Sequence, residues 1–124
     1  MSSESSVDTL SREALIDLAI DGWRISRLLD RLIARLDPID AVRYAGQARY
    51  FHGRIDECLA KAQLRLVSLE GQAFDEGMAA TAINLSDFEA SDALVVDQMV
   101  VPIVLDQGGI VRTGSVVVAL APQR

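Results

Sequence analysis

Apolar residues follow a helical period through the first half of the chain. From Ser11 the period runs without a proline to Leu36, with apolar residues three or four positions apart. This spacing predicts an amphipathic helix roughly 40 Å long, at 1.5 Å per residue. One seam of the helix consists of Leu15, Leu18, Gly22, Ile25, Leu29, Leu32 and Leu36, and a second apolar row consists of Ile16, Ile20, Trp23 and Ile33.

The segment Asp37-Pro38-Ile39-Asp40 predicts the end of this helix and the start of another. Proline cannot continue a helix but is favoured at the first position of the next one, which Asp37 is suited to cap. The period then resumes, and Gly71 is the expected end of the second helix. Because the link is short, we expect an antiparallel helical hairpin over residues 11–71. The polar residues 1–10 are expected to be disordered.

Residues 72–124 have the pattern of a small antiparallel β domain, so the predicted fold class is α+β. The segment is rich in β-branched residues, and Pro102 interrupts its longest run, which indicates an edge, bend or bulge. Gly114 is expected to mark a bulge or a close approach of two backbone segments. We expect the strands, in chain order, at residues 79–84, 93–105 and 110–120, with a turn at residues 106–109.

The predicted hairpin has more apolar surface than one partner helix can cover. If the rest stayed in water, the exposed patch would exceed the few hundred Å² that monomeric proteins normally show. The sequence therefore predicts a homodimer in which two hairpins form a four-helix bundle. The residues expected at this interface are Leu18, Ile25, Leu29, Leu32, Phe51 and Ile55.

Composition limits the possible partners and compartments. A formal net charge of −6 argues against binding nucleic acid, because phosphate binding needs clustered Lys and Arg. The first residues lack the basic start and apolar core of a signal peptide, and no apolar run approaches the roughly 20 residues of a membrane helix. We therefore expect a cytoplasmic protein without a membrane partner.

The residues that usually carry catalysis are scarce. His52 and Cys58 are the sole residues of their types, and no nucleophile, base and orienting group can be named together. We expect no enzymatic activity, no cofactor and no metal site. His52 is interpreted as a residue at the border of the bundle, Cys58 as a buried structural residue, and Trp23 as a core or dimer-packing residue. The acidic segment 86–92 is interpreted as a solvated loop.

Several short motifs resemble those of GrpE proteins, the nucleotide exchange factors of DnaK-type chaperones. In that family a helical dimerisation region is followed by a glycine and a Phe-Asp-Pro segment, and then by a compact β domain. The resemblance covers about residues 12–121, and its matching segments are Leu28–Leu32, Gly53–Leu69, Gly71–Asp75, Asp92–Met99, Pro102 and Gly108–Ala119. The chain departs from the family pattern at Glu76, Ile103, Val104 and Gly109.

The resemblance implies a co-chaperone that acts in protein folding without chemistry of its own. Its β domain would bind the nucleotide-binding domain of a DnaK-type ATPase and favour the open state, from which ADP leaves. By the same resemblance, Arg112 would pair with a chaperone carboxylate, while Met99, Pro102 and Val118 would supply apolar contacts. Given the departures, we expect a specialised exchange factor. The alternative is a dimeric adaptor or scaffold that has lost exchange activity.

Overall fold

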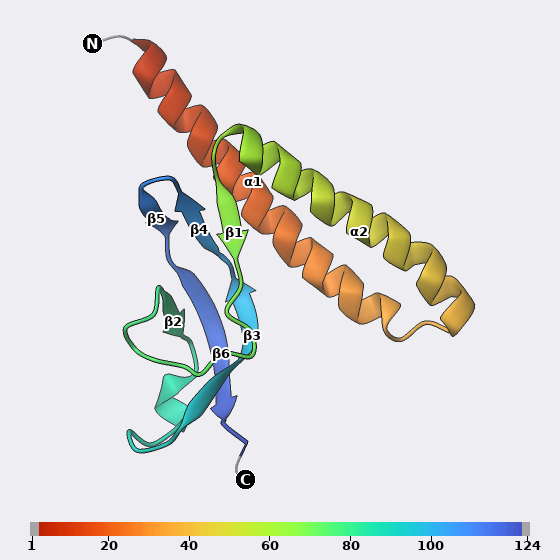
Figure 1. The fold of residues 1–124 in the computed structure, drawn as a ribbon, viewed down its shortest axis with the longest axis vertical. Helices are drawn as coiled ribbons and strands as arrows, with labels where there is room; N and C mark the ends of the chain where they lie inside the picture. The colour runs from red at the N-terminus through yellow and green to blue at the C-terminus, as the bar shows by residue number, and fades with distance from the viewer. Residues whose placement is uncertain (1–2, 123–124) are drawn as a thin grey trace. The chain divides into compact units, whose positions relative to one another are not determined.

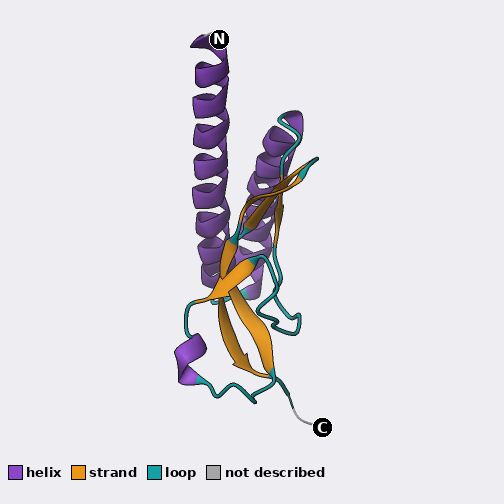
Figure 2. Cartoon of the chain, turned by 90° about the vertical axis from the view of Figure 1, so that its left-hand side faces the viewer, coloured by secondary structure: helices purple, strands orange, loops and turns teal. Residues whose placement is uncertain are grey.

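The structure of the protein is a computed structural model that describes residues 3–122. The chain divides into two compact units, Met1–Leu64 and Arg65–Arg124. The first unit is helical, and the second consists of short strands with one 3-10 turn, as the colours of Figure 2 show. The predicted α+β class is confirmed. The border between the units falls after Leu64 rather than at Gly71.

Two helices joined by a tight turn form the first unit (Figure 1). Helix α1 spans Ser3–Ile33 and helix α2 spans Pro38–Lys61. The helix therefore begins at Ser3, where the sequence suggested disorder up to residue 10, while Met1 and Ser2 lie outside the described residues.

The start of α2 is the one predicted from the sequence. Asp37 has an extended backbone, and its carboxylate Oδ1 accepts hydrogen bonds from the backbone N–H groups of Ile39 at 3.0 Å and Asp40 at 3.1 Å. Pro38 occupies the first helical turn, where its missing N–H costs no hydrogen bond. This cap fixes the direction in which the chain leaves the turn.

The end of α2 differs from the prediction. The helix stops at Lys61, and Gln63 takes the left-handed conformation with φ 61° that glycine usually provides. The N–H of Leu64 donates to the carbonyl of Leu59, and the N–H of Gln63 donates to that of Ala60, both at 2.9 Å. These two bonds form a Schellman motif, and Leu59 and Leu64 are both buried, as that motif favours.

The second unit contains two three-stranded sheets. In the first sheet the order is β1-β4-β5, and β4 pairs antiparallel with both neighbours. In the second sheet the order is β2-β6-β3. The strands span Arg65–Val67 (β1), Ala80–Ala82 (β2), Leu94–Val101 (β3), Ile103–Asp106 (β4), Gly109–Arg112 (β5) and Gly114–Leu120 (β6), and the 3-10 turn η1 spans Leu85–Asp87.

One strand corrects the expectation of a wholly antiparallel β part. Strand β2 pairs parallel with β6, while β3 pairs antiparallel with it. Parallel pairing needs a long connection, and residues 83–113 supply it. The segment Arg65–Val67, expected as the last turns of the second helix, is strand β1, whose Leu66 lies opposite Val104 of β4.

Two bends carry the chain from one sheet to the other. Pro102 separates β3 from β4, and Thr113 separates β5 from β6. At the second bend, a Cβ atom added to Gly114 would lie 2.5 Å from the carbonyl oxygen of Val101 and 2.7 Å from Cε of Met99. The predicted close backbone approach at Gly114 is confirmed. Buried apolar side chains of this unit are Ala80, Leu94, Val96, Met99, Ile103, Val104, Val116 and Val118.

Candidate interaction surfaces

The helical hairpin is held by one row of small and apolar side chains from each helix. On α1 the buried residues recur at intervals of three, four or seven positions, which places them on one face. On α2 the matching row is richer in alanine, so the helices can lie close together. The rows are Ile16, Ala19, Trp23, Ser26 and Ile33 on α1, and Ala41, Ala45, Ala48, His52, Ile55 and Leu59 on α2.

A second apolar row on α1 remains exposed in the single chain. With 3.6 residues per turn, it lies about 100° around the helix from the buried row. Leu18 is 72% exposed, Ile25 is 60% exposed and Leu32 is 53% exposed. Leu28 and Leu29 extend this surface, which we call the α1 seam, and α2 adds Phe51 beside it. Five of the six residues predicted for dimerisation are therefore exposed, whereas Ile55 is buried inside the hairpin.

The α1 seam borders an apolar groove between the two helices. The groove has a volume of about 280 Å³ and runs past Leu15, Leu18 and Gly22 of α1. A Cβ atom at Gly22 would lie 3.1 Å from Cδ1 of Ile55 and 3.5 Å from Cζ of Phe51, so the absent side chain lets α2 approach. Cys58 also lines the groove and is half-buried, which corrects its expected full burial.

Arg54 provides the charged edge of this groove. Its Nη1 donates to Oε2 of Glu57 at 2.6 Å, one helical turn away. This hydrogen bond raises the pKa of the Arg54 guanidinium, and both side chains are largely exposed. The same guanidinium lies 4.0 Å, through Nη2, from Sγ of Cys58, another residue that lines the groove.

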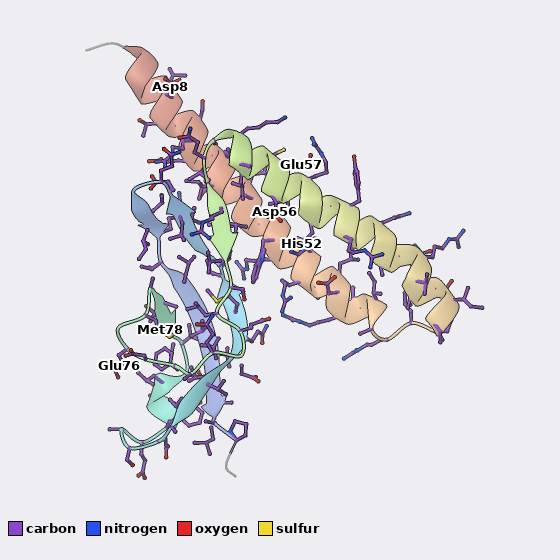
Figure 3. The ribbon with its side chains drawn as sticks, in the orientation of Figure 1. Asp8, His52, Asp56, Glu57, Glu76 and Met78 are labelled. Atoms are coloured by element: carbon purple, nitrogen blue, oxygen red, sulfur yellow. The ribbon has the colours of Figure 1, made fainter. Side chains whose placement is uncertain are left out.

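A polar pair lies within the helix interface. Ser26 Oγ lies 2.5 Å from Nδ1 of His52, and Ser26 is fully buried (His52 is labelled in Figure 3). A serine that is closed to solvent is not placed to attack a substrate, so this pair is structural. His52, interpreted from the sequence as a border residue, is half-buried and also forms a hydrogen bond that ties α2 to α1.

In the β unit, three of the four predicted partner-binding residues belong to the core. Met99 is 1% exposed, Val118 is 2% exposed, and Pro102 is fully buried. Met99 also accepts a hydrogen bond on its sulfur from the backbone N–H of Leu69 at 3.4 Å. These three side chains support the fold and do not face a partner in this conformation.

Arg112 is the predicted partner-binding residue that lies nearer the surface. It is half-buried on β5, which forms one edge of its sheet. Ile110 lies two residues earlier on the same strand and is 58% exposed, and a register shift between the two residues interrupts the regular alternation of faces. A strand edge with one cation and one exposed apolar residue is a suitable surface for a partner chain.

A scan against protein-family models found no match to this chain, and searches of curated proteins and of solved structures found no significant match. The similarity to GrpE proteins thus remains a prediction from the sequence motifs. Neither a membrane-spanning helix nor a cluster of metal-binding side chains occurs among the residues that the structure describes.

Asn84 forms structural hydrogen bonds that the sequence analysis did not predict. Its side-chain Nδ2 donates to the carbonyl of Val118, and its Oδ1 accepts from the N–H of Val118, both at 2.9 Å. The amide thus continues the pairing with β6 beyond β2, as a backbone peptide would. No sequence signal distinguishes this asparagine from one in an ordinary loop, because its partner is 34 residues away.

Proposed function

We propose that the protein is a self-associating, GrpE-like co-chaperone that promotes ADP release from a DnaK-type ATPase. The exposed α1 seam is the observation that supports self-association most directly. It presents a row of large apolar side chains beside an apolar groove, and burying them against a second hairpin would complete a four-helix bundle. The motifs shared with GrpE proteins support the exchange activity.

In this proposal the partner meets the β unit at strand β5. Arg112 pairs with a carboxylate of the ATPase, and the exposed Ile110 supplies an apolar contact in place of the buried Met99, Pro102 and Val118. Exchange requires only that the protein bind the open, nucleotide-free ATPase more tightly than the closed one. A hundredfold faster release corresponds to a release barrier lowered by about 2.7 kcal/mol.

The test is stopped-flow release of a fluorescent ADP from DnaK-type ATPases, with and without the full-length protein. Arg112→Ala is expected to weaken both complex formation and ADP release by about 1–3 kcal/mol if the guanidinium pairs with a desolvated carboxylate. Arg65→Ala is the control, because it removes an exposed cation from β1 at the other edge of the same sheet. Equal effects of the two variants would remove Arg112 from the interface.

An adaptor or scaffold without exchange activity is the second candidate. It is favoured by the core positions of Met99, Pro102 and Val118, and by Glu76 at the place where GrpE proteins have a proline. The same experiment separates the two functions. An adaptor would bind an ATPase or another partner with ADP release unchanged.

A further inference from the structure

The β unit contains a second surface feature, distant in sequence from Arg112. It is a hollow of about 690 Å³ between the turn at residues 74–76 and the segment 85–94, which holds η1 and the loop before β3. Its walls are partly apolar: Leu94 is buried, and Phe74, Leu85 and Phe88 are half-buried. The N–H of Phe74 donates to the carbonyl of Leu94 at 2.9 Å, so one wall is anchored to β3.

The charged residues around this hollow are all acidic. Asp75, Glu76, Glu89 and Asp92 line it, and no basic side chain of residues 3–122 does. Oδ1 of Asp75 accepts from the N–H of Gly77 at 2.9 Å, and Oδ2 of Asp92 accepts from the N–H of Glu89 at 2.8 Å. These bonds hold two of the carboxylates in place (Glu76 is labelled in Figure 3). None of the four is joined to a basic side chain among the described residues.

We propose that this hollow binds an arginine-bearing, partly apolar segment of a partner protein. A guanidinium is planar, stacks on aromatic rings and forms paired hydrogen bonds with carboxylates, so the Phe74 and Phe88 rings and the acidic rim complement it together. Apolar neighbours of that arginine would pack against Leu85. The volume suits a few side chains of an extended segment.

The chemistry of the hollow selects against other occupants. Four carboxylates repel nucleic acid and anionic lipid surfaces. A bare metal ion is disfavoured because the side chains here do not form a metal-binding cluster among the described residues. The proposal does not depend on exchange activity, since Arg112 does not line the hollow and any partner with such a segment would fit.

The test is fluorescence anisotropy of the full-length protein with the labelled peptide Leu-Arg-Leu-Arg-Leu. A peptide with citrulline at both arginine positions keeps the shape and loses the charge, and is expected to bind at least tenfold more weakly. Glu76→Gln/Glu89→Gln should weaken binding of the arginine peptide about tenfold. Phe88→Leu keeps every charge and should weaken it severalfold by removing the ring.

The matched control is Asp8→Asn/Asp97→Asn, which removes the same charge from exposed positions outside the hollow. It should bind the arginine peptide within twofold of the wild type. Circular dichroism establishes that each variant is folded. Equal loss in the control, or equal binding of the citrulline peptide, would overturn the assignment, because either result means that general acidity or apolar contact accounts for the binding.

Discussion

Ser26 and His52 form a hydrogen bond that joins α1 to α2 at a point where Ser26 is closed to solvent. The side chains in the surrounding rows are mostly aliphatic, so sliding one helix by a turn would leave both polar groups without this partner. A buried polar group without a hydrogen bond is costly. The pair therefore selects one register of the hairpin. Aliphatic rows alone discriminate poorly between registers.

Replacing Ser26 with Ala should destabilise the hairpin by about 1–3 kcal/mol, because His52 Nδ1 then loses its partner at a half-buried position. Ser26→Ala/His52→Leu should cost less than the sum of the single changes, since no polar group remains to be satisfied. Urea unfolding at a fixed protein concentration measures both. Ser11→Ala, on the exposed surface of α1, is the control, and an equal loss there would contradict the role of the pair.

Ile25→Asp should prevent self-association while leaving the hairpin folded. Ile25 is 60% exposed in the single chain, so the charge is tolerated there, but burial in a dimer would desolvate it. We expect the dissociation constant to rise at least about 100-fold, or about 3 kcal/mol. Light scattering should give about twice the 13.5 kDa chain mass for the wild type and one chain mass for the variant.

Val42→Asp is the matched control for this change. Val42 is 76% exposed, and it lies about half a turn around α2 from Phe51, away from the groove. The control variant should remain dimeric. A wild-type protein that is a folded monomer at micromolar concentration would contradict the four-helix bundle.

Gly114→Ala should destabilise the β unit by at least about 1–3 kcal/mol, the usual cost of overpacking. The new methyl group would meet the Val101 carbonyl, which is backbone and cannot turn aside as a side chain can. Gly46→Ala is the contrasting change, since nothing lies within 4 Å of its Cβ position and alanine favours a helix by about 1 kcal/mol. Thermal unfolding should show opposite shifts for the two variants.

Asp37 should make the stability of α2 depend on pH. Its carboxylate accepts the backbone N–H of Asp40, and this bond holds the pKa of Asp37 below its ordinary value of 3.8. A carboxylate with a lowered pKa stabilises the folded state above that ordinary value, and the contribution is lost as the pH falls through the folded pKa. Unfolding of the wild type should therefore become easier in acid for this reason among others.

Asp37→Asn isolates this effect, because asparagine also caps helices but does not titrate. Urea unfolding at pH 7 and pH 2.5 measures the free energy of unfolding of both proteins. Between these two pH values the wild type should lose more stability than the variant. Asp56→Asn, an exposed carboxylate within α2 that caps no helix end, should show a smaller shift. A pH-independent difference for Asp37→Asn would contradict the capping role.

The sequence predicted elements wherever a local signal fixed them. Asp37-Pro38 fixed the start of α2, and Pro102 marked the place where β3 ends. The end of α2 was missed because Gln63 adopts the left-handed conformation without being glycine. The parallel pairing of β2 was also missed, because it depends on β6, more than thirty residues later, and on no pattern within β2 itself.

Prediction of the candidate surfaces likewise succeeded where a local pattern was sufficient and failed where the folded chain decides. Helical periodicity separated the α1 seam from the charged side of the helix. It did not show that Ile55, which lines the groove, is already buried within the single hairpin. Met99 and Val118 were expected at the surface through the family resemblance. Val118 lies inward by alternation along β6, whereas Met99 lies inward because a register shift after Val96 interrupts the alternation of β3. The acidic hollow joins segments that only the folded chain brings together.

The order of strands in the second sheet determines when that sheet can form during synthesis. β2 and β3 do not pair with each other; each is hydrogen-bonded to β6, which the ribosome makes after both. Until residues 114–120 have emerged, the nascent chain carries two strands without their common neighbour. The helical hairpin, whose contacts are local, has no such requirement, so it can fold while its own β unit is still incomplete.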